Sequence, residues 1–268
     1  MRLWVADGER GLMRLEQEGW RRIGPPGNAL CVSDHTVWCA GQERCRCYDG
    51  ETGSLCRETA LPTGVCALAA LDQKVYALSS DADSVTAFDA ETGSILACAP
   101  AGVYPRGLCP HPRRRLLLIA GGASGEMLLL SASLRCLNAY RLPGTVCGAC
   151  FFGQGMAALC AVETGASLSA RLFSVTFRGV TEEVLALPLL PCCLAPNPDG
   201  GCVVGCCGEA LRIRPNKKTA FRRPVSCPIR LRCFPGGTLA CDAGEGVLLL
   251  PAGRKLYTGP DPQDSVVL

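Results

Sequence analysis

The chain has 268 residues, of which 48% are hydrophobic and 19% are charged, and its formal net charge is +3. This composition excludes an intrinsically disordered chain. The nearly neutral charge excludes the strong electrostatic field of a general nucleic-acid or membrane binder. The length suits two small domains or one large all-β domain.

The N-terminal residues, MRLWVADGERG, contain no apolar signal-peptide core, and no uncharged apolar run reaches the roughly 18 residues that span a bilayer. We therefore expect a cytoplasmic chain with no membrane partner. Its twenty cysteines are many for that compartment. Because the cytosol keeps thiols reduced and a reduced cysteine packs as a small hydrophobe, we expect free, mostly buried thiols.

Along the chain, residues 1–24 contain three strand-like runs, and a repeat then begins. Residues 48–55 (YDGETGSL) and 88–95 (FDAETGSI) are nearly identical and start 40 positions apart (88 minus 48). A fixed repeat of this length is typical of solenoids and propellers. The runs around each copy read as strand, turn, strand, Glu-Thr-Gly turn, strand.

The Glu-Thr-Gly triplets predict the outer hairpin of each unit. Gly53 and Gly93 can adopt a positive φ, and the carboxylates of Asp49 and Asp89 can accept hydrogen bonds from backbone N–H groups of the turn. Repeats of four strand-like runs continue to residue 259. They predict blades at residues 28–60, 64–100, 105–142, 145–188, 191–224 and 229–259.

The N-terminal unit lacks an innermost strand, and the apolar, β-branched tail DSVVL (264–268) can supply it. Both chain ends would then share one blade, which removes free sheet edges. The sequence thus predicts an all-β, seven-bladed β-propeller of four-stranded antiparallel blades, formed by residues 1–268 as a single domain.

Three segments carry a resemblance to a known family: residues 74–96, 103–122 and 196–204, which include Pro-Arg-Gly, Pro-Asp-Gly and Asp-x-x-Thr-Gly elements. They resemble the YVTN-type (YncE-like) seven-bladed propeller repeats of prokaryotes, closely in blades two to four and weakly in the fifth. The resemblance implies the fold and leaves the function open, because propellers host many unrelated activities. Family members are often exported, and the cysteine content here departs from their pattern.

Residues suited to catalysis are few. The two histidines, His35 and His111, fall in predicted turns, where a solvated polar role is expected rather than that of a general base. No G-x-S-x-G elbow, Walker loop or G-x-G-x-x-G before a helix is present. We expect no cofactor. The basic run at residues 113–115 has no interleaved aromatic residues, which argues against a nucleic-acid partner.

Cysteine pairs are a second candidate for chemistry. Cys147 and Cys150 have C-x-x-C spacing, but residues three apart in a strand point to opposite faces, so we expect no shared metal ion. The same argument applies to two adjacent pairs, Cys192-Cys193 and Cys206-Cys207.

Cysteines also recur in the predicted innermost strands of five blades, at Cys31, Cys66, Cys109, Cys150 and Cys233. Blades converge at the axis, so small side chains are expected there for packing, and we predict no metal site. The alternative is an axial ring of thiols that captures a soft cation such as Cu(I) or Hg(II).

Charged residues predict one functional face. Acids collect in the loops between second and third strands, which share a face with the blade crossovers, and two arginines begin inner strands near the axis. The predicted ligand face, which would receive a cationic or polar partner, consists of Arg106, Asp81, Asp83, Arg230, Asp242 and Glu245. Ordinary solvated turns are the alternative interpretation.

The sequence favours a non-enzymatic binding or scaffold propeller, a monomer whose partner is an unidentified protein or small ligand. The first alternative is a lactonase- or lyase-like enzyme in which Asp81 or Glu245 acts with Arg106 at the axial mouth. The second alternative is a thiol-based metal or redox sensor.

Overall fold

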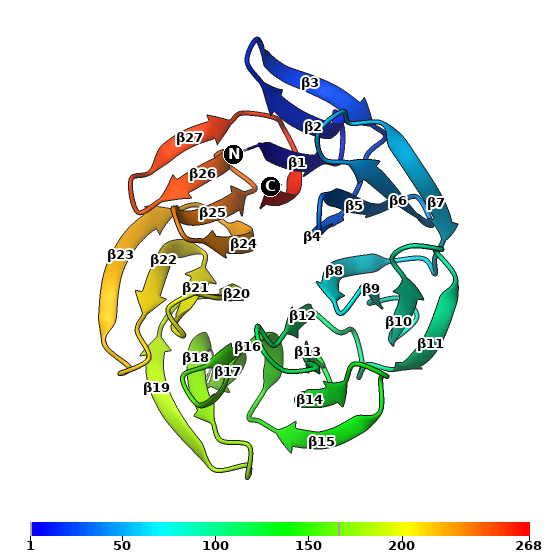
Figure 1. Ribbon diagram of the computed structural model, residues 1–268. Helices are drawn as coiled ribbons and strands as arrows, with labels where there is room; N and C mark the ends of the chain where they lie inside the picture. Colours follow the sequence, from blue (N-terminus) through cyan, green and yellow to red (C-terminus); the bar gives the residue numbers. More distant parts are fainter. Residues whose placement is uncertain (1, 166) are drawn as a thin grey trace.

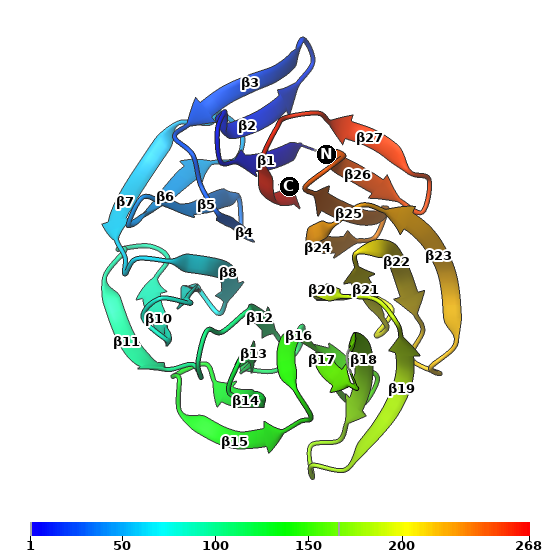
Figure 2. The same cartoon turned by 180° about the vertical axis from the view of Figure 1, so that it is seen from behind.

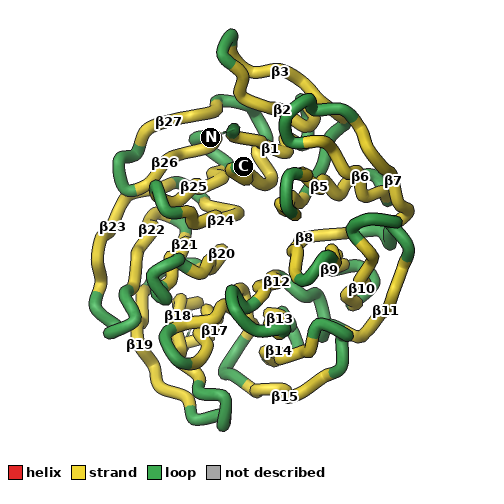
Figure 3. Tube along the Cα trace, in the orientation of Figure 1, coloured by secondary structure: helices red, strands yellow, loops and turns green. Residues whose placement is uncertain are grey.

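The protein is a closed ring of seven four-stranded antiparallel sheets. In the computed structural model, which describes residues 2–165 and 167–268, the chain runs once around the ring and its two ends lie in the same sheet (Figure 1). The view from behind shows the same ring (Figure 2). The described residues form strands, turns and loops (Figure 3), and none of them forms a helix that could cross a membrane. The predicted seven-bladed β-propeller is confirmed.

We number the blades from the N-terminus and give their strands from the axis outward. Blade 1 contains β28 (Pro262–Val267), β1 (Leu3–Asp7), β2 (Gly11–Glu16) and β3 (Gly19–Gly24). Blades 2 to 4 contain β4 (Ala29–Ser33), β5 (Thr36–Gly41), β6 (Arg44–Asp49), β7 (Leu55–Ala60), β8 (Val65–Leu71), β9 (Lys74–Ser79), β10 (Ser84–Asp89), β11 (Ile95–Pro100), β12 (Gly107–Pro110), β13 (Leu116–Ala120), β14 (Glu126–Ser131) and β15 (Cys136–Arg141). Blades 5 to 7 contain β16 (Thr145–Phe152), β17 (Gly155–Thr164), β18 (Ser167–Val175), β19 (Thr181–Leu187), β20 (Pro191–Pro196), β21 (Cys202–Cys206), β22 (Gly208–Ile213), β23 (Thr219–Val225), β24 (Pro228–Phe234), β25 (Gly237–Asp242), β26 (Gly246–Leu250) and β27 (Arg254–Tyr257).

The tail closes the ring as the sequence predicts. Strand β28 pairs antiparallel with β1, and Trp4 lies opposite Val266. Two backbone hydrogen bonds of 3.0 Å between Arg2 and Leu268 extend this pairing. The closing strand begins at Pro262, two residues before the predicted start. Strand β1 is thereby paired on both edges, with β28 on the axial side and β2 on the other side.

A buried ion pair fixes the closing strand to its neighbours. The guanidinium of Arg232 on β24 donates to both carboxylate oxygens of Asp264 on β28, at 3.0 Å and 2.6 Å. Arg232 also donates to the carbonyl oxygen of Leu30 on β4, and the Leu30 N–H donates to Asp264. Three blades therefore meet at one carboxylate that is fully buried. The sequence pattern alone does not reveal this contact.

The Glu-Thr-Gly turns have the predicted chemistry. The carboxylate of Asp49 accepts hydrogen bonds from the N–H groups of Glu51 and Thr52, at 3.0 Å and 2.7 Å, and Gly53 has a φ of 77°. The second copy is equivalent, since Asp89 accepts two backbone bonds at 2.9 Å and 2.7 Å. The repeated octapeptide thus encodes a self-capped turn at the outer hairpin of a blade.

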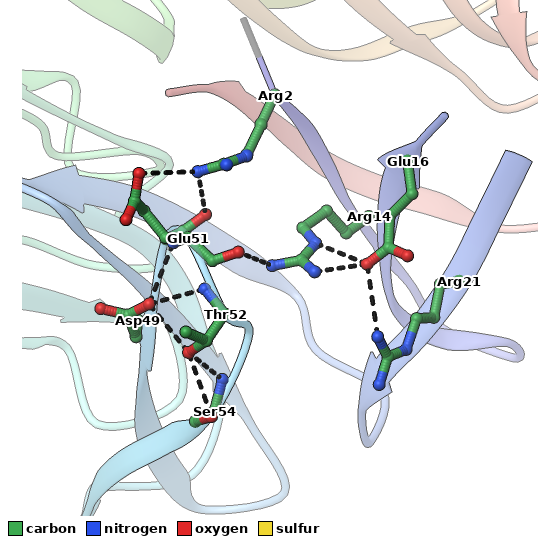
Figure 4. Close-up of polar contacts among 9 residues, drawn as sticks. Arg2, Arg14, Glu16, Arg21, Asp49, Glu51, Thr52 and Ser54 are labelled. Carbon is green, nitrogen blue, oxygen red and sulfur yellow. Dashed lines mark hydrogen bonds and ion pairs between the residues drawn. The ribbon is translucent and has the colours of Figure 1, made fainter. Parts of the chain in front are cut away.

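Each of these turns is also a contact point for the preceding blade. Arg14 on β2 donates to the carbonyl oxygen of Glu51 in the turn of blade 2, at 3.0 Å (Figure 4). Arg57 on β7 donates to the carbonyl oxygen of Ala90 in the turn of blade 3, at 2.8 Å. The repeat therefore specifies packing between blades as well as the shape of the turn.

The contact between blades 1 and 2 is a small ionic network (Figure 4). Arg14 is only 5% exposed, pairs with Glu16 and lies over the ring of Trp4 at 5.2 Å. Arg2 pairs with Glu51 at 3.6 Å. Burial of the Arg14 stem and its several acceptors hold the first blade against the second.

We expect Asp264→Asn to lower the free energy of unfolding by about 3 kcal/mol, the low end for a broken buried ion pair, because the half-buried Arg232 charge loses its partner. Urea denaturation of the two proteins measures the difference. Asp34→Asn, at an exposed turn, is the matched control and should leave the midpoint unchanged. Equal midpoints for wild type and Asp264→Asn would contradict the assigned role.

The pH dependence provides a second readout of the same ion pair. Burial alone would raise the pKa of Asp264, but the charges of Arg232 and Arg230, together with the hydrogen bonds from Arg232 and from the Leu30 N–H, outweigh it and hold this pKa below its usual value. A carboxylate with a lowered folded-state pKa stabilises the protein fully above its unfolded pKa, about 3.9, and loses that contribution as the pH falls through the folded value. Acid should therefore destabilise the wild type more steeply than Asp264→Asn.

Candidate functional site

A cavity of about 630 Å³ lies at the axis on what we call the crossover face, where the chain enters each innermost strand. Its wall is formed by inner-strand residues of blades 3 to 7, including Cys66, Gly107, Gly148, Cys192 and Ile229. This volume falls within the range of about 300–1,000 Å³ that is usual for small-molecule sites. The closed ring of blades is what brings these distant segments together.

Three of the six predicted face residues line this cavity. Arg106 and Asp81 are exposed, and Arg230 is half-buried. The Arg230 guanidinium donates a hydrogen bond to the carbonyl oxygen of Cys66, which joins blade 7 to blade 3 across the axis. Its Nε is buried and has no hydrogen-bond partner among the described residues. The cavity thus contains two arginines and one carboxylate that have no ion-pair partner in the described part of the chain.

The other three predicted residues form hydrogen bonds or an ion pair within the loops of the crossover face. Asp83 accepts a hydrogen bond of 2.8 Å from the N–H of Tyr104, and Glu245 forms an ion pair with Lys255. Asp242 is fully buried, and its carboxylate accepts backbone N–H bonds from its own turn and from the preceding crossover. These three side chains do not line the cavity, because backbone donors and a lysine hold them elsewhere on the crossover face.

Tyr104 is a residue of the cavity rim that sequence analysis did not single out. Its side chain is 61% exposed and lines the cavity beside Arg106. Its φ of 49° lies in the left-handed region, which is uncommon for a large side chain. The hydrogen bond from its N–H to Asp83 holds this conformation. The position of this aromatic residue directly before the Pro-Arg-Gly element could have indicated in the sequence that it lies at the axial rim.

A smaller cavity of about 240 Å³ lies along the inner strands of blades 1 to 4 and 7, and its lining includes Cys31, Leu68 and Val266. Arg232 and Cys233 line both cavities. The Arg230 and Arg232 side chains follow each other at a two-residue interval on β24, so both can point to the axis. That alternation was a sequence signal for arginines at the axis, but it does not identify Asp264 as the partner of Arg232.

The five inner-strand cysteines do not form a common site. Cys66, Cys109 and Cys233 line the larger cavity, and Cys31 lines the smaller one. Cys150 is buried in the same hydrophobic cluster as Cys202 of the next blade. Within the described residues, the one group of three or more potential metal ligands within 4.8 Å of one another includes none of these five.

The two thiols of a cysteine pair lie in different surroundings, and thiols of two different pairs meet. Cys147 lines the larger cavity, whereas Cys150 is buried between blades. Cys193 is buried and donates to the carbonyl oxygen of Pro228 at 3.0 Å, away from Cys192. Cys192, however, meets Cys207 from the other adjacent pair, with 3.5 Å between their sulfur atoms. Judging each pair alone missed this contact.

No family model matches the chain, and no curated protein matches it in sequence. The chain is similar in structure to a candidate 6-phosphogluconolactonase from Bacteroides uniformis, with a TM-score of 0.71, 13% identity and coverage of 99% of this chain and 98% of that chain. It is similar to a chain of the mitotic checkpoint complex, with a TM-score of 0.74, 10% identity and coverage of 91% and 82%. It is also similar to virginiamycin B lyase from Staphylococcus aureus, with a TM-score of 0.70, 11% identity and coverage of 90% and 88%. At these identities the comparisons support the propeller fold alone.

Thiol reactivity should follow burial. Of the twenty free cysteines, eleven are buried, and the three exposed ones lie on the outermost strands of blades 2 to 4, at Cys56, Cys98 and Cys136. Burial raises the pKa of Cys31 and Cys241 to about 12, which suppresses their reactive thiolates.

We expect a small alkylating reagent to label the three outer-strand cysteines of the native protein first, and the buried eleven only after unfolding. Mass spectrometry of peptides from briefly labelled protein identifies the sites, and denatured protein labelled at all twenty positions is the control. Labelling of Cys31 or Cys109 as fast as Cys56 would show that the axis is open to the reagent.

Proposed function

We propose that this chain is a non-enzymatic binding and scaffold protein whose crossover face takes up a protein segment or small molecule with an anionic group. The observation that carries the proposal is the presence of Arg106 and Arg230 in one axial cavity with Asp81 as the accompanying acid. Guanidinium groups bind carboxylates and phosphates through paired hydrogen bonds. The loop acids Asp83 and Asp242, which favoured a cationic or polar partner, bond to backbone N–H groups outside the cavity, so the arginines dominate its unpaired charge.

The rim of the cavity supports a macromolecular partner. Tyr104, Val103 and Leu190 are exposed large hydrophobic residues in loops of the crossover face, with exposed fractions of 61%, 46% and 50%. Aromatic residues beside arginines are enriched at protein interfaces, where they supply most of the binding energy. A peptide segment with an acidic side chain or a C-terminal carboxylate would match both the apolar rim and the charged cavity.

We also propose a repeat family, a cellular compartment and an oligomeric state for this protein. The elements in residues 74–96, 103–122 and 196–204 support membership of the YVTN-type prokaryotic repeats. All twenty cysteines are free thiols, which suits a reducing compartment such as the cytoplasm. We take the protein to act as a monomer that presents a single cavity-bearing face.

An enzyme of the lactonase or lyase kind is the second candidate, because an acid and two arginines do share the cavity. In that case the arginines would polarise a carbonyl group and Asp81 would activate water or remove a proton. Turnover of 6-phosphogluconolactone that is lost in Asp81→Asn would favour this candidate over the binding proposal.

We expect Arg106→Glu to weaken partner capture about tenfold or more, which corresponds to about 1.4 kcal/mol. The substitution reverses a charge at an exposed position of the cavity and should not affect folding. Crosslinking and affinity purification at native expression level, followed by titration of the recovered partner, measure the change. Arg113→Glu, an exposed position in the turn after β12, is the matched control.

Two outcomes would contradict the binding proposal. One is equal capture by the wild type and Arg106→Glu. The other is a loss of capture in Arg113→Glu as large as in Arg106→Glu, which would place the partner away from the cavity.

A further inference from the structure

Three cysteine sulfurs meet beside the axial cavity. The Sγ atoms of Cys192 and Cys207 lie 3.5 Å apart, and those of Cys207 and Cys227 lie 3.6 Å apart. All three lie within 4.8 Å of one another, and residues 2–165 and 167–268 contain no other group of three potential ligand atoms this close. Each of the three residues is half-buried, so an ion can reach them while most of the surrounding water is excluded.

The backbone brings these cysteines together from three separate segments. Cys207 lies in the turn between β21 and β22, and its N–H donates to the carbonyl oxygen of Leu190 at 2.9 Å, just ahead of β20. The next residue, Gly208, donates its N–H to the carbonyl oxygen of Ser226 at 3.0 Å, just ahead of the third cysteine. The turn is therefore bonded on both sides to the segments that carry its partners.

The third cysteine is anchored by a buried carboxylate. The N–H of Cys227 donates to Asp242 at 2.9 Å, and the carbonyl oxygen of Cys227 accepts a bond of 3.0 Å from Ala243. Asp242 is in turn held by the N–H groups of Gly244 and Glu245. The three sulfurs are thus preorganised by main-chain bonds, and their proximity does not depend on flexible side chains alone.

The chemistry of the cluster is that of soft ligands. Hard cations prefer oxygen ligands, whereas sulfur ligands select Cu(I) and Zn(II). Structural zinc is almost always four-coordinate, and this cluster offers three sulfur atoms.

We propose that Cys192, Cys207 and Cys227 bind one Cu(I) ion through their three sulfur atoms, at the edge of the axial cavity. On binding, each S–H bond is replaced by a sulfur–copper bond and three protons pass to the solvent. The copper stays monovalent, so the step consumes no oxidant or reductant. This site is independent of the proposed ligand of Arg106 and Arg230.

The observed spacing is close to what such a site needs. A metal–sulfur distance of about 2.3 Å places the sulfurs of a planar three-coordinate site about 4.0 Å apart. The two sulfur separations of 3.5 Å and 3.6 Å must lengthen by about 0.5 Å (4.0 minus 3.5) and about 0.4 Å (4.0 minus 3.6). Small side-chain rotations provide such a shift without moving the main-chain hydrogen bonds.

The test is an oxygen-free titration of the reduced full-length protein with Cu(I), with bicinchoninate as a competing chelator. We expect one tightly bound ion per chain, and X-ray absorption should report three sulfur neighbours around the copper. Replacement of all three residues by serine should lower the affinity more than about 100-fold, because even indirect partners of a metal ligand contribute about 10–100-fold. Cys207→Ser alone, which removes the central thiol, should give most of this loss.

The matched control replaces the three exposed outer-strand cysteines, Cys56, Cys98 and Cys136, by serine, and it should bind copper like the wild type. Circular dichroism and thermal unfolding establish that each variant is folded before its titration is interpreted. The proposal is overturned by wild-type protein that binds no Cu(I), by an equal loss in the control, or by unchanged binding in folded Cys207→Ser. Zinc bound more tightly than copper in a parallel titration would overturn the assignment of the ion.

Discussion

The ion pair between Arg232 and Asp264 is the contact on which the ring depends. A propeller has no sequence-local way to join its first and last blades, so closure must be made by residues far apart in the chain. Here one carboxylate on β28 accepts bonds from β24 and from β4 and thereby joins blades 7, 1 and 2 at the axis. A buried carboxylate is tolerated only when its charge is paired and its oxygens are hydrogen-bonded, and both conditions are met.

The closed ring determines what the crossover face can present. Acids at the ends of second strands serve the loops: Asp7, like Asp242, is fully buried and accepts backbone N–H bonds two and three residues ahead. Because such acids are used in this way, the unpaired charges left near the axis are mainly arginines. The loops of the crossover face are acidic in the sequence, whereas the charges that are free to bind a partner near the axis are mainly positive.

The local part of the fold could be predicted from the sequence, and the part made between blades could not. The Asp-x-x-Thr-Gly turns at Asp49 and Asp89 depend on neighbours within five residues, and so their hydrogen bonds follow from the motif. The partner of Asp264 lies 32 residues away, and Cys207 meets Cys192 and Cys227 only after three segments are folded side by side. The alternation along a strand predicts on which side of its sheet a side chain lies. It does not predict which residue of another blade that side chain contacts.

The hydrogen bond from Arg230 to Cys66 joins blades that are not neighbours in the ring. It crosses the axial cavity and holds the guanidinium of Arg230 between blades 7 and 3. An anion that draws this guanidinium away from Cys66 would break the contact between blades 3 and 7. Occupancy of the cavity is therefore linked to a contact between two blades that are not consecutive in the chain.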